Sequence, residues 1–104
     1  MAKFRVVTLC GSTKFKEEFL NIQELLTKEG YVVLSVGFFS HADNITITEE
    51  REEMLRAIHR QKIDMADEVF VINKNGYIGE NTRLEIEYAK ELGKTVRYLE
   101  AVRF

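Results

Sequence analysis

The sequence contains no proline and only one cysteine, Cys10, among its 104 residues. One cysteine cannot form a disulfide within the chain, and its isolation is typical of a protein from a reducing compartment. The first residues, Met1, Ala2 and Lys3, lead directly into a predicted strand without a signal-peptide pattern. We therefore expect a cytoplasmic protein, while the absence of proline says nothing about function.

Positive charge and long apolar segments are also scarce. The 15 Lys and Arg residues are outnumbered by 17 Asp and Glu residues, which gives a formal net charge of -2. A nucleic-acid-binding domain normally has a basic stripe, so we exclude a nucleic acid polymer as partner, although backbone N–H groups could still bind one phosphate. The longest apolar run, residues 31–39, is too short to span a membrane and is interrupted by Ser35 and Gly37.

Side chains that bind metals are few and lie far apart in the sequence. Cys10 is the only thiol, and the two histidines, His41 and His59, have no cluster of further ligands around them. We therefore assign no metal and no other cofactor. A lone histidine such as His59 is more often a half-buried surface residue than a catalyst, whereas His41 follows Phe38 and Phe39 in an irregular loop and could line a pocket.

The chain does contain a regular alternation of strand-like and helix-like segments. Short apolar runs predict strands at 4–9, 31–36, 68–73 and 95–99, and apolar residues at helical spacing predict helices between them. Gly30 is expected to stop the first helix, and Thr46 and Glu49 have the spacing of a capping box that opens the second. Residues 1–104 therefore form a single α/β domain of the doubly wound, flavodoxin- or Rossmann-like class, with four to five parallel strands.

We predict the strand order 2-1-3-4. The run 69–72 lies at the centre, because its unbroken apolar character indicates burial on both faces. This order puts a topological switch point between the first and third strands, where ligands of such sheets bind. The loops expected at that point are residues 10–14, 37–44 and 74–82.

The first of these loops contains Gly11, Ser12 and Thr13, directly after the first predicted strand. Glycine permits close backbone approach, and a helix N-terminus offers free N–H groups and the positive end of its dipole, so the turn could hold a phosphate. The alternative is that Ser12 or Thr13 is only a helix N-cap. The glycine pattern of a dinucleotide site is incomplete here, so the residues alone leave both interpretations open.

Carboxylates of interest occur at two further places. Asp64 and Asp67 flank the start of the third strand, at the wrong edge of the sheet for a switch-point site, so we interpret them as capping or solvated groups rather than an acid–base pair. Glu85 lies three residues after Thr82, which is the spacing of a second capping box, with Gly93 ending that helix. The other interpretation has Glu85 facing the switch point from the first turn of the helix, where it could attack a sugar carbon.

Three segments carry a resemblance to a known family: VTLCGS at 7–12, ADEVFV at 66–71, and LEIEYA at 84–89 followed by LGK at 92–94. With them, nearly the whole chain resembles the nucleoside 2-deoxyribosyltransferase superfamily, including the 2'-deoxynucleoside 5'-phosphate N-hydrolases. The resemblance implies a doubly wound fold, a nucleoside or nucleotide ligand, and cleavage of its N-glycosidic bond or transfer of the deoxyribosyl group. It also implies homodimers or larger homo-oligomers.

By position, the resemblance implies that Glu85 is the nucleophile. It places His59 where relatives have an aspartate that assists catalysis, and a protonated His59 could take over that role. The resemblance matches Gly11 and Ser12 to the turn that holds the 5'-phosphate in the N-hydrolases. The residues we expect to bind substrate are Cys10, Gly11, Ser12, Thr13, Gly79 and Asn81.

Other positions depart from the family's pattern. Thr8 replaces an aromatic residue, Gly79 replaces an aspartate or a phosphate-binding serine, and Glu87 replaces a helix glycine. The sequence stops at Phe104, so the segment that in relatives completes a neighbour's site is not expected here.

These departures leave three interpretations of function. The first is an enzyme in which Glu85 attacks C1' of a nucleoside monophosphate, and water or another base takes the sugar. The second is a catalytically inactive nucleotide-binding module on the same fold, and the third is a subunit whose corresponding face only contacts a partner. We also expect at least a homodimer, because seven phenylalanines and four tyrosines in a short chain leave some aromatic surface exposed, with Phe38, Phe39, Tyr77 and Tyr88 as candidates.

Overall fold

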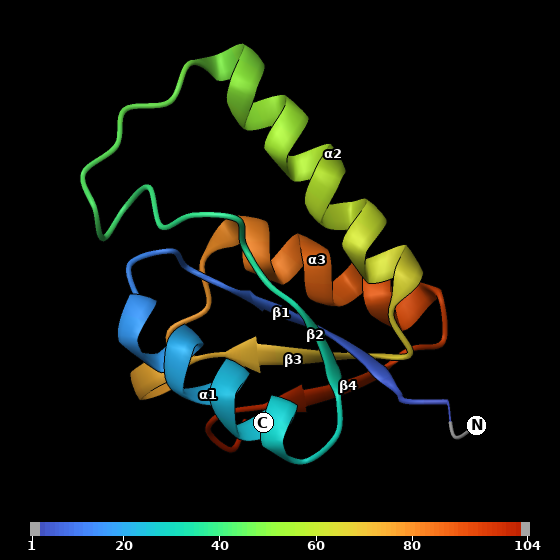
Figure 1. Ribbon diagram of the computed structural model, residues 1–104. Coiled ribbons are helices and arrows are strands. Elements are labelled where there is room, and N and C mark those ends of the chain that lie inside the picture. The colour runs from blue at the N-terminus through green and yellow to red at the C-terminus, as the bar shows by residue number, and fades with distance from the viewer. Residues whose placement is uncertain (1–2, 103–104) are drawn as a thin grey trace.

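A computed structural model describes residues 3–102 of the protein. Its sheet contains β1 (Val6–Gly11), β2 (Val32–Leu34), β3 (Glu68–Ile72) and β4 (Thr95–Tyr98), all parallel and in the order β2-β1-β3-β4. The helices are α1 (Lys16–Lys28), α2 (Glu49–Met65) and α3 (Glu80–Glu91), with a short 3-10 turn, η1 (Lys74–Gly76), after β3. The doubly wound α/β class and the strand order 2-1-3-4 are therefore confirmed (Figure 1).

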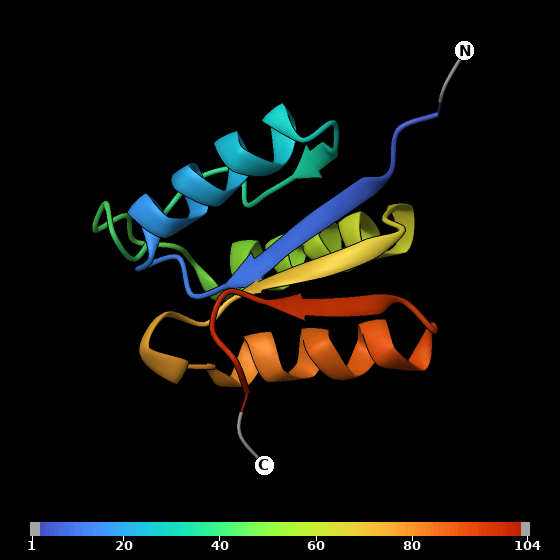
Figure 2. The ribbon, with the colours of Figure 1, turned by 90° about the horizontal axis from the view of Figure 1, so that it is seen from below.

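The helices cover both faces of the sheet, with α1 on one side and α2 and α3 on the other (Figure 2). Side chains alternate along β1, so Leu9 packs with the α1 residues Phe19 and Leu26, while Cys10 packs with Ile63 of α2 and with α3. All five residues of β3 are buried between β1 and β4, which confirms the predicted central position of the run 69–72. Two apolar layers thus fix the sheet between its helices.

The N-terminus of α2 differs from the predicted capping box. The helix begins at Glu49, and Thr48 is its N-cap, with its Oγ1 accepting a hydrogen bond from the backbone N–H of Arg51 at 3.3 Å. The prediction that Thr46 caps this helix was wrong. Threonines two residues apart offer alternative caps, and Thr48 is the one that stands directly before the acidic first turn.

The second predicted capping box is also absent. Helix α3 starts at Glu80 after Gly79, so Thr82 lies inside the helix, where it is buried, and makes no side-chain cap. Glu85 consequently lies in the second turn instead of the first. The prediction for the other end is confirmed, because Gly93 follows the last helical turn with a φ of +74° and donates to the carbonyl of Lys90.

No helix within residues 3–102 is both long and apolar enough to cross a lipid bilayer.

Candidate functional site

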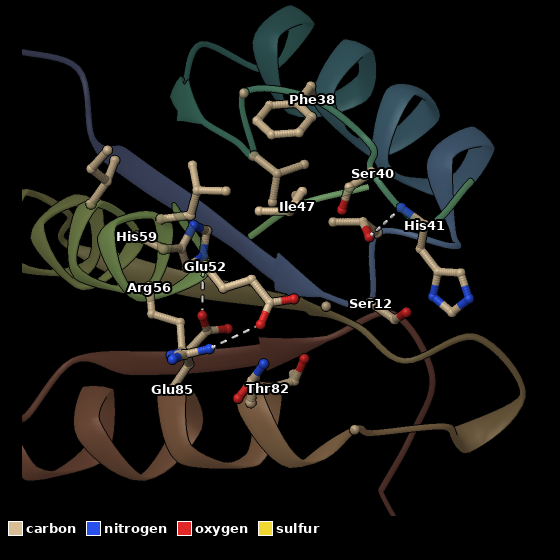
Figure 3. A pocket seen from close by; sticks show the side chains of 18 of the residues that line it. Ser12, Phe38, Ser40, His41, Ile47, Glu52, Arg56, His59, Thr82 and Glu85 are labelled. Atoms are coloured by element: carbon tan, nitrogen blue, oxygen red, sulfur yellow. Dashed lines mark hydrogen bonds and ion pairs between the residues drawn. The ribbon is translucent and has the colours of Figure 1, made fainter. Parts of the chain in front are cut away.

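A cavity of about 610 Å³ opens at the carboxyl edge of the sheet (Figure 3). Its lining comes from the turn after β1, the loop between β2 and α2, one face of α2, and the start of α3. The ends of β1 and β3 lie side by side here, and the helices that follow them cover opposite faces of the sheet. The cavity thus occupies the switch point of the sheet, and all three predicted loops contribute to it.

Glu85 lies in the cavity wall with its side chain only 17 % exposed, and its Oε2 is 3.9 Å from Nε2 of His59. Burial raises the pKa of Glu85 to about 7, although a hydrogen bond with the thiol of Cys10 and the charge of Arg60 act in the opposite direction. The capping interpretation of this glutamate was wrong, because α3 has no side-chain N-cap bond. Desolvation therefore favours the neutral carboxyl of Glu85 at this position in the second turn of α3.

His59 projects from α2 onto the same spot and is buried. Its pKa falls to about 4, first because of burial and then because of the neighbouring charge of Lys62, while a backbone hydrogen bond with Leu9 acts the other way. The ring is therefore neutral near pH 7. Its Nε2 also lies 3.4 Å from Sγ of Cys10, so the expectation that His59 has no further metal-binding side chains near it was wrong.

Cys10 is fully buried beneath this pair and is not among the residues that line the cavity. Burial, followed by the charge of Glu85, raises the pKa of the thiol well above its usual value, so it is protonated near neutral pH. The neighbouring Thr8, also fully buried, donates from Oγ1 to the carbonyl of Lys62 at 2.7 Å. This hydrogen bond of Thr8 therefore joins the last turn of α2 to the middle of β1.

The turn Gly11-Ser12-Thr13 forms one wall of the cavity. Gly11 has a structural reason to lack a side chain, because a Cβ there would lie 2.8 Å from the carbonyl oxygen of Ile72 in β3. Ser12 Oγ accepts from the N–H of Lys14 at 3.3 Å, while Thr13 Oγ1 accepts from the N–H of His41 at 3.2 Å. Neither hydroxyl is the N-cap of α1, which starts at Lys16, so the N-cap interpretation was wrong.

Gly79 and Asn81 also line the cavity, at the start of α3. Gly79 occupies the N-cap position with an extended backbone, and a Cβ there would lie 3.3 Å from the hydroxyl of Tyr77. Glu87, the other departure on this helix, is exposed and accepts from Arg83 at 2.6 Å. It therefore belongs to the surface and not to the site.

Sequence reasoning missed the contribution of α2, whose residues Glu52, Arg56 and Lys62 line the cavity together with His59. Nη1 of Arg56 lies 4.0 Å from Oε2 of Glu52, and Figure 3 marks this ion pair with a dashed line. The signal was present, since residues 52, 56 and 59 follow the i, i+4, i+7 spacing of one helix face. The apolar residues of the same segment give no further signal for this face, because Met54 and Ile58 are themselves exposed.

The aspartates at the other edge of the sheet have structural roles, as interpreted from the sequence. Asp67 accepts from the N–H of Val6 at 2.8 Å, and Asp64 accepts from the hydroxyl of Tyr88. They lie at the N-terminal edge of the sheet, and neither lines the cavity.

Fold and site together define a doubly wound α/β protein with a buried thiol–imidazole–carboxylate cluster at a switch-point cavity. The chain belongs to the DUF4406 family, described as a domain of unknown function, which matches residues 7–98. Comparison with curated proteins and with solved structures gave no match.

Proposed function

We propose that this protein binds a nucleoside or nucleotide in the switch-point cavity and cleaves its N-glycosidic bond, with Glu85 as the nucleophile. The observation that carries the proposal is the Glu85 carboxylate, which lies in the cavity wall beside His59 and not at a helix cap. Among the described residues, only His59 lies within ion-pair distance of this carboxylate, while the more distant charge of Arg60 favours its ionised form. The resemblance to the nucleoside 2-deoxyribosyltransferase superfamily supports the same assignment.

The cavity has the size and the mixed lining that such a ligand requires. Its volume of about 610 Å³ lies within the roughly 300–1,000 Å³ typical of small-molecule sites. Phe38 and Ile47 provide an apolar wall on the side of the β2–α2 loop, across from Glu85 (Figure 3). Ser12 and Asn81 provide polar groups near the start of α3. In the proposed complex the base packs against the apolar wall, and the sugar faces Glu85.

The proposed reaction has two steps. An oxygen of ionised Glu85 attacks C1', the bond from C1' to the base nitrogen breaks, and the base leaves with that electron pair and takes up a proton from solvent. Water then attacks C1' of the glycosyl ester, which releases the sugar and regenerates the carboxylate. With a pKa of about 4 His59 is a weak base, so the proton of that water passes to solvent, and a second base in place of water would give deoxyribosyl transfer.

Binding without cleavage is the second candidate, and one observation favours it. Near pH 7 His59 is neutral, and the pKa of Glu85 is about 7, so a large share of the protein lacks the charged nucleophile. A module that only binds a nucleotide needs neither a charged His59 nor a charged Glu85.

The test is release of free base from a panel of purine and pyrimidine nucleoside monophosphates, with nucleotide binding measured in parallel. We expect release by the wild type, loss of release with retained binding for Glu85→Gln, and normal release for Glu87→Gln. The control removes an exposed carboxylate from the same helix, two residues further along. Undiminished release by Glu85→Gln would exclude the assigned nucleophile, whereas binding without release by the wild type would establish the module.

We further propose that the protein forms a homodimer in the cytoplasm. Of the four aromatic candidates, Phe38 and Tyr77 are exposed, whereas Phe39 packs against Phe19 and Tyr88 is partly buried. The exposed Met54, Ile58 and Met65 add a larger apolar surface on one face of α2. This face supports the α2 helix as the dimer contact.

A further inference from the structure

We propose that Cys10, His59 and Glu85 form a binding site for one Zn²⁺ ion. The three side chains come from β1, α2 and α3, and their donor atoms all lie within 4.8 Å of one another. Groups of exposed acidic residues reach such distances by chance. This cluster is different, because Cys10 and His59 are buried and the Glu85 side chain is only 17 % exposed. Three chemically different donors have been brought together by three separate elements of the fold.

The spacing of the donors is close to that of a zinc site. Sγ of Cys10 lies 3.4 Å from Nε2 of His59, which in turn lies 3.9 Å from Oε2 of Glu85. Zn–S bonds of about 2.3 Å and Zn–N and Zn–O bonds of about 2.0–2.2 Å, in tetrahedral directions, put ligand atoms roughly 3.3–3.6 Å apart. Small side-chain rotations therefore suffice to place all three donors around one ion.

The donor set also favours zinc among the divalent cations. A thiolate and an imidazole are soft or borderline ligands, which select Zn²⁺ over Mg²⁺ or Ca²⁺. Bound Zn²⁺ would meet one thiolate and one carboxylate, so the buried cluster becomes electrically neutral. With Nε2 turned to the cluster, Nδ1 of the ring remains for a second contact of the type that orients zinc-binding histidines.

Three protein ligands leave the fourth tetrahedral position free, and the cavity lies on that side of the cluster. His59 and Glu85 both line the cavity, whereas Cys10 lies beneath them. A water molecule or a ligand in the cavity would complete the coordination. Binding converts the thiol of Cys10 to a thiolate, and the released proton passes to the buffer, as does the proton of any neutral Glu85.

The zinc site does not depend on the proposed cleavage, but it has a consequence for it. Zinc would hold the carboxylate oxygen that attacks C1', so we expect Zn²⁺ to inhibit base release and a chelator to restore it. A protein that binds zinc and releases no base in chelator would retain the zinc site and lose the proposed function. A protein that releases base and binds no zinc would retain the proposed function and exclude the zinc site.

The first test uses Co²⁺ as a spectroscopic probe on the purified wild-type chain. Cys10 is the only cysteine, so a thiolate-to-cobalt charge-transfer band in the near ultraviolet can come only from this residue. We expect the band to saturate at one Co²⁺ per chain and to vanish when one equivalent of Zn²⁺ is added, because zinc binds such sites more tightly than cobalt. Absence of the band, or a band that zinc does not displace, would overturn the proposal without any variant.

The second test is calorimetric titration of Zn²⁺ into Cys10→Ser and His59→Gln, with His41→Gln as the matched control. His41 is the other histidine of the chain and lies outside the cluster, on the exposed loop. We expect the two cluster variants to bind more than about 100-fold more weakly, since loss of even a second-shell partner costs about 10–100-fold. The control should bind as the wild type does. Unchanged affinity in both cluster variants, with folding confirmed by circular dichroism, would refute the site, as would an equal loss in His41→Gln.

Discussion

Nε2 of His59 lies 3.9 Å from Oε2 of Glu85, which is the distance of an ion pair, yet the two groups avoid being charged together. Burial raises the pKa of Glu85 to about 7 and lowers that of His59 to about 4. Between these values both side chains are predominantly neutral, so the contact is not a salt bridge in that range. The surroundings of the two side chains are of low polarity. They disfavour a charge on Glu85 or on His59 more strongly than the opposite charge of the partner would favour it.

The first prediction is that these two residues make opposite contributions to the pH dependence of stability. Glu85 titrates near 4.5 when unfolded and near 7 when folded, so its contribution to the free energy of unfolding is lost as pH rises between those values. His59 titrates near 6.5 when unfolded and near 4 when folded, so its contribution is gained as pH rises between 4 and 6.5. Each of these two pKa shifts corresponds to a change of about 3 kcal/mol in the free energy of unfolding. In the wild type the two contributions should largely cancel.

Urea denaturation in chelator at several pH values tests this cancellation. The free energy of unfolding of Glu85→Gln, relative to wild type, should increase by about 3 kcal/mol as pH rises from 4.5 to 7. That of His59→Gln should decrease by about the same amount between pH 4 and 6.5. Differences that stay constant with pH in both variants would show that neither pKa is displaced.

The second prediction is a pH profile for the proposed cleavage. Only ionised Glu85 can attack C1', so the rate of base release in chelator should rise about tenfold per pH unit below 7 and level off above it. The measurement is initial rates at saturating substrate, with protein stability checked at each pH. A rate that falls as pH rises through 7 would identify the protonated carboxyl as the active form and exclude the nucleophile.

The third prediction concerns the exposed apolar face of α2. Met54, Ile58 and Met65 lie on one side of this helix and are all exposed. Burial of such surface is favourable by roughly 25 cal/mol per Å², so we expect sedimentation velocity at micromolar concentration to show a dimer. Met54→Glu should shift the protein to monomer, because a charge would be buried in the contact. A wild-type monomer would rule out the dimer, and a dimeric Met54→Glu would rule out this face.

The sequence predicted those features of the fold and site that leave a distinctive pattern along the chain. The sheet was predictable because the unbroken apolar run at 69–72 and the alternation of segments leave few other arrangements. The capping boxes were not, since a Thr and a Glu three residues apart also occur inside a helix, as Thr82 and Glu85 do. The resemblance named Cys10, His59 and Glu85 as site residues, but the local sequence pattern did not predict that the thiol of Cys10 contacts the imidazole. Residues 10, 59 and 85 meet only through side-chain packing across three elements, which no local pattern records.

The last prediction separates the two explanations of Gly11, close approach of a phosphate and close approach of β3. A Cβ at this position would lie 2.8 Å from the backbone carbonyl oxygen of Ile72 and 3.3 Å from the ring of Phe19, and the strand cannot move without disturbing its pairing. Gly11→Ala should therefore destabilise the ligand-free protein by about 1–3 kcal/mol, as overpacking usually does. Gly37→Ala is the control, because nothing lies within 4 Å of its Cβ and its stability should stay within about 0.5 kcal/mol of wild type. The measurement is urea denaturation without ligand. A Gly11→Ala protein of wild-type stability that has lost nucleotide binding would assign this glycine to the ligand instead of to the sheet.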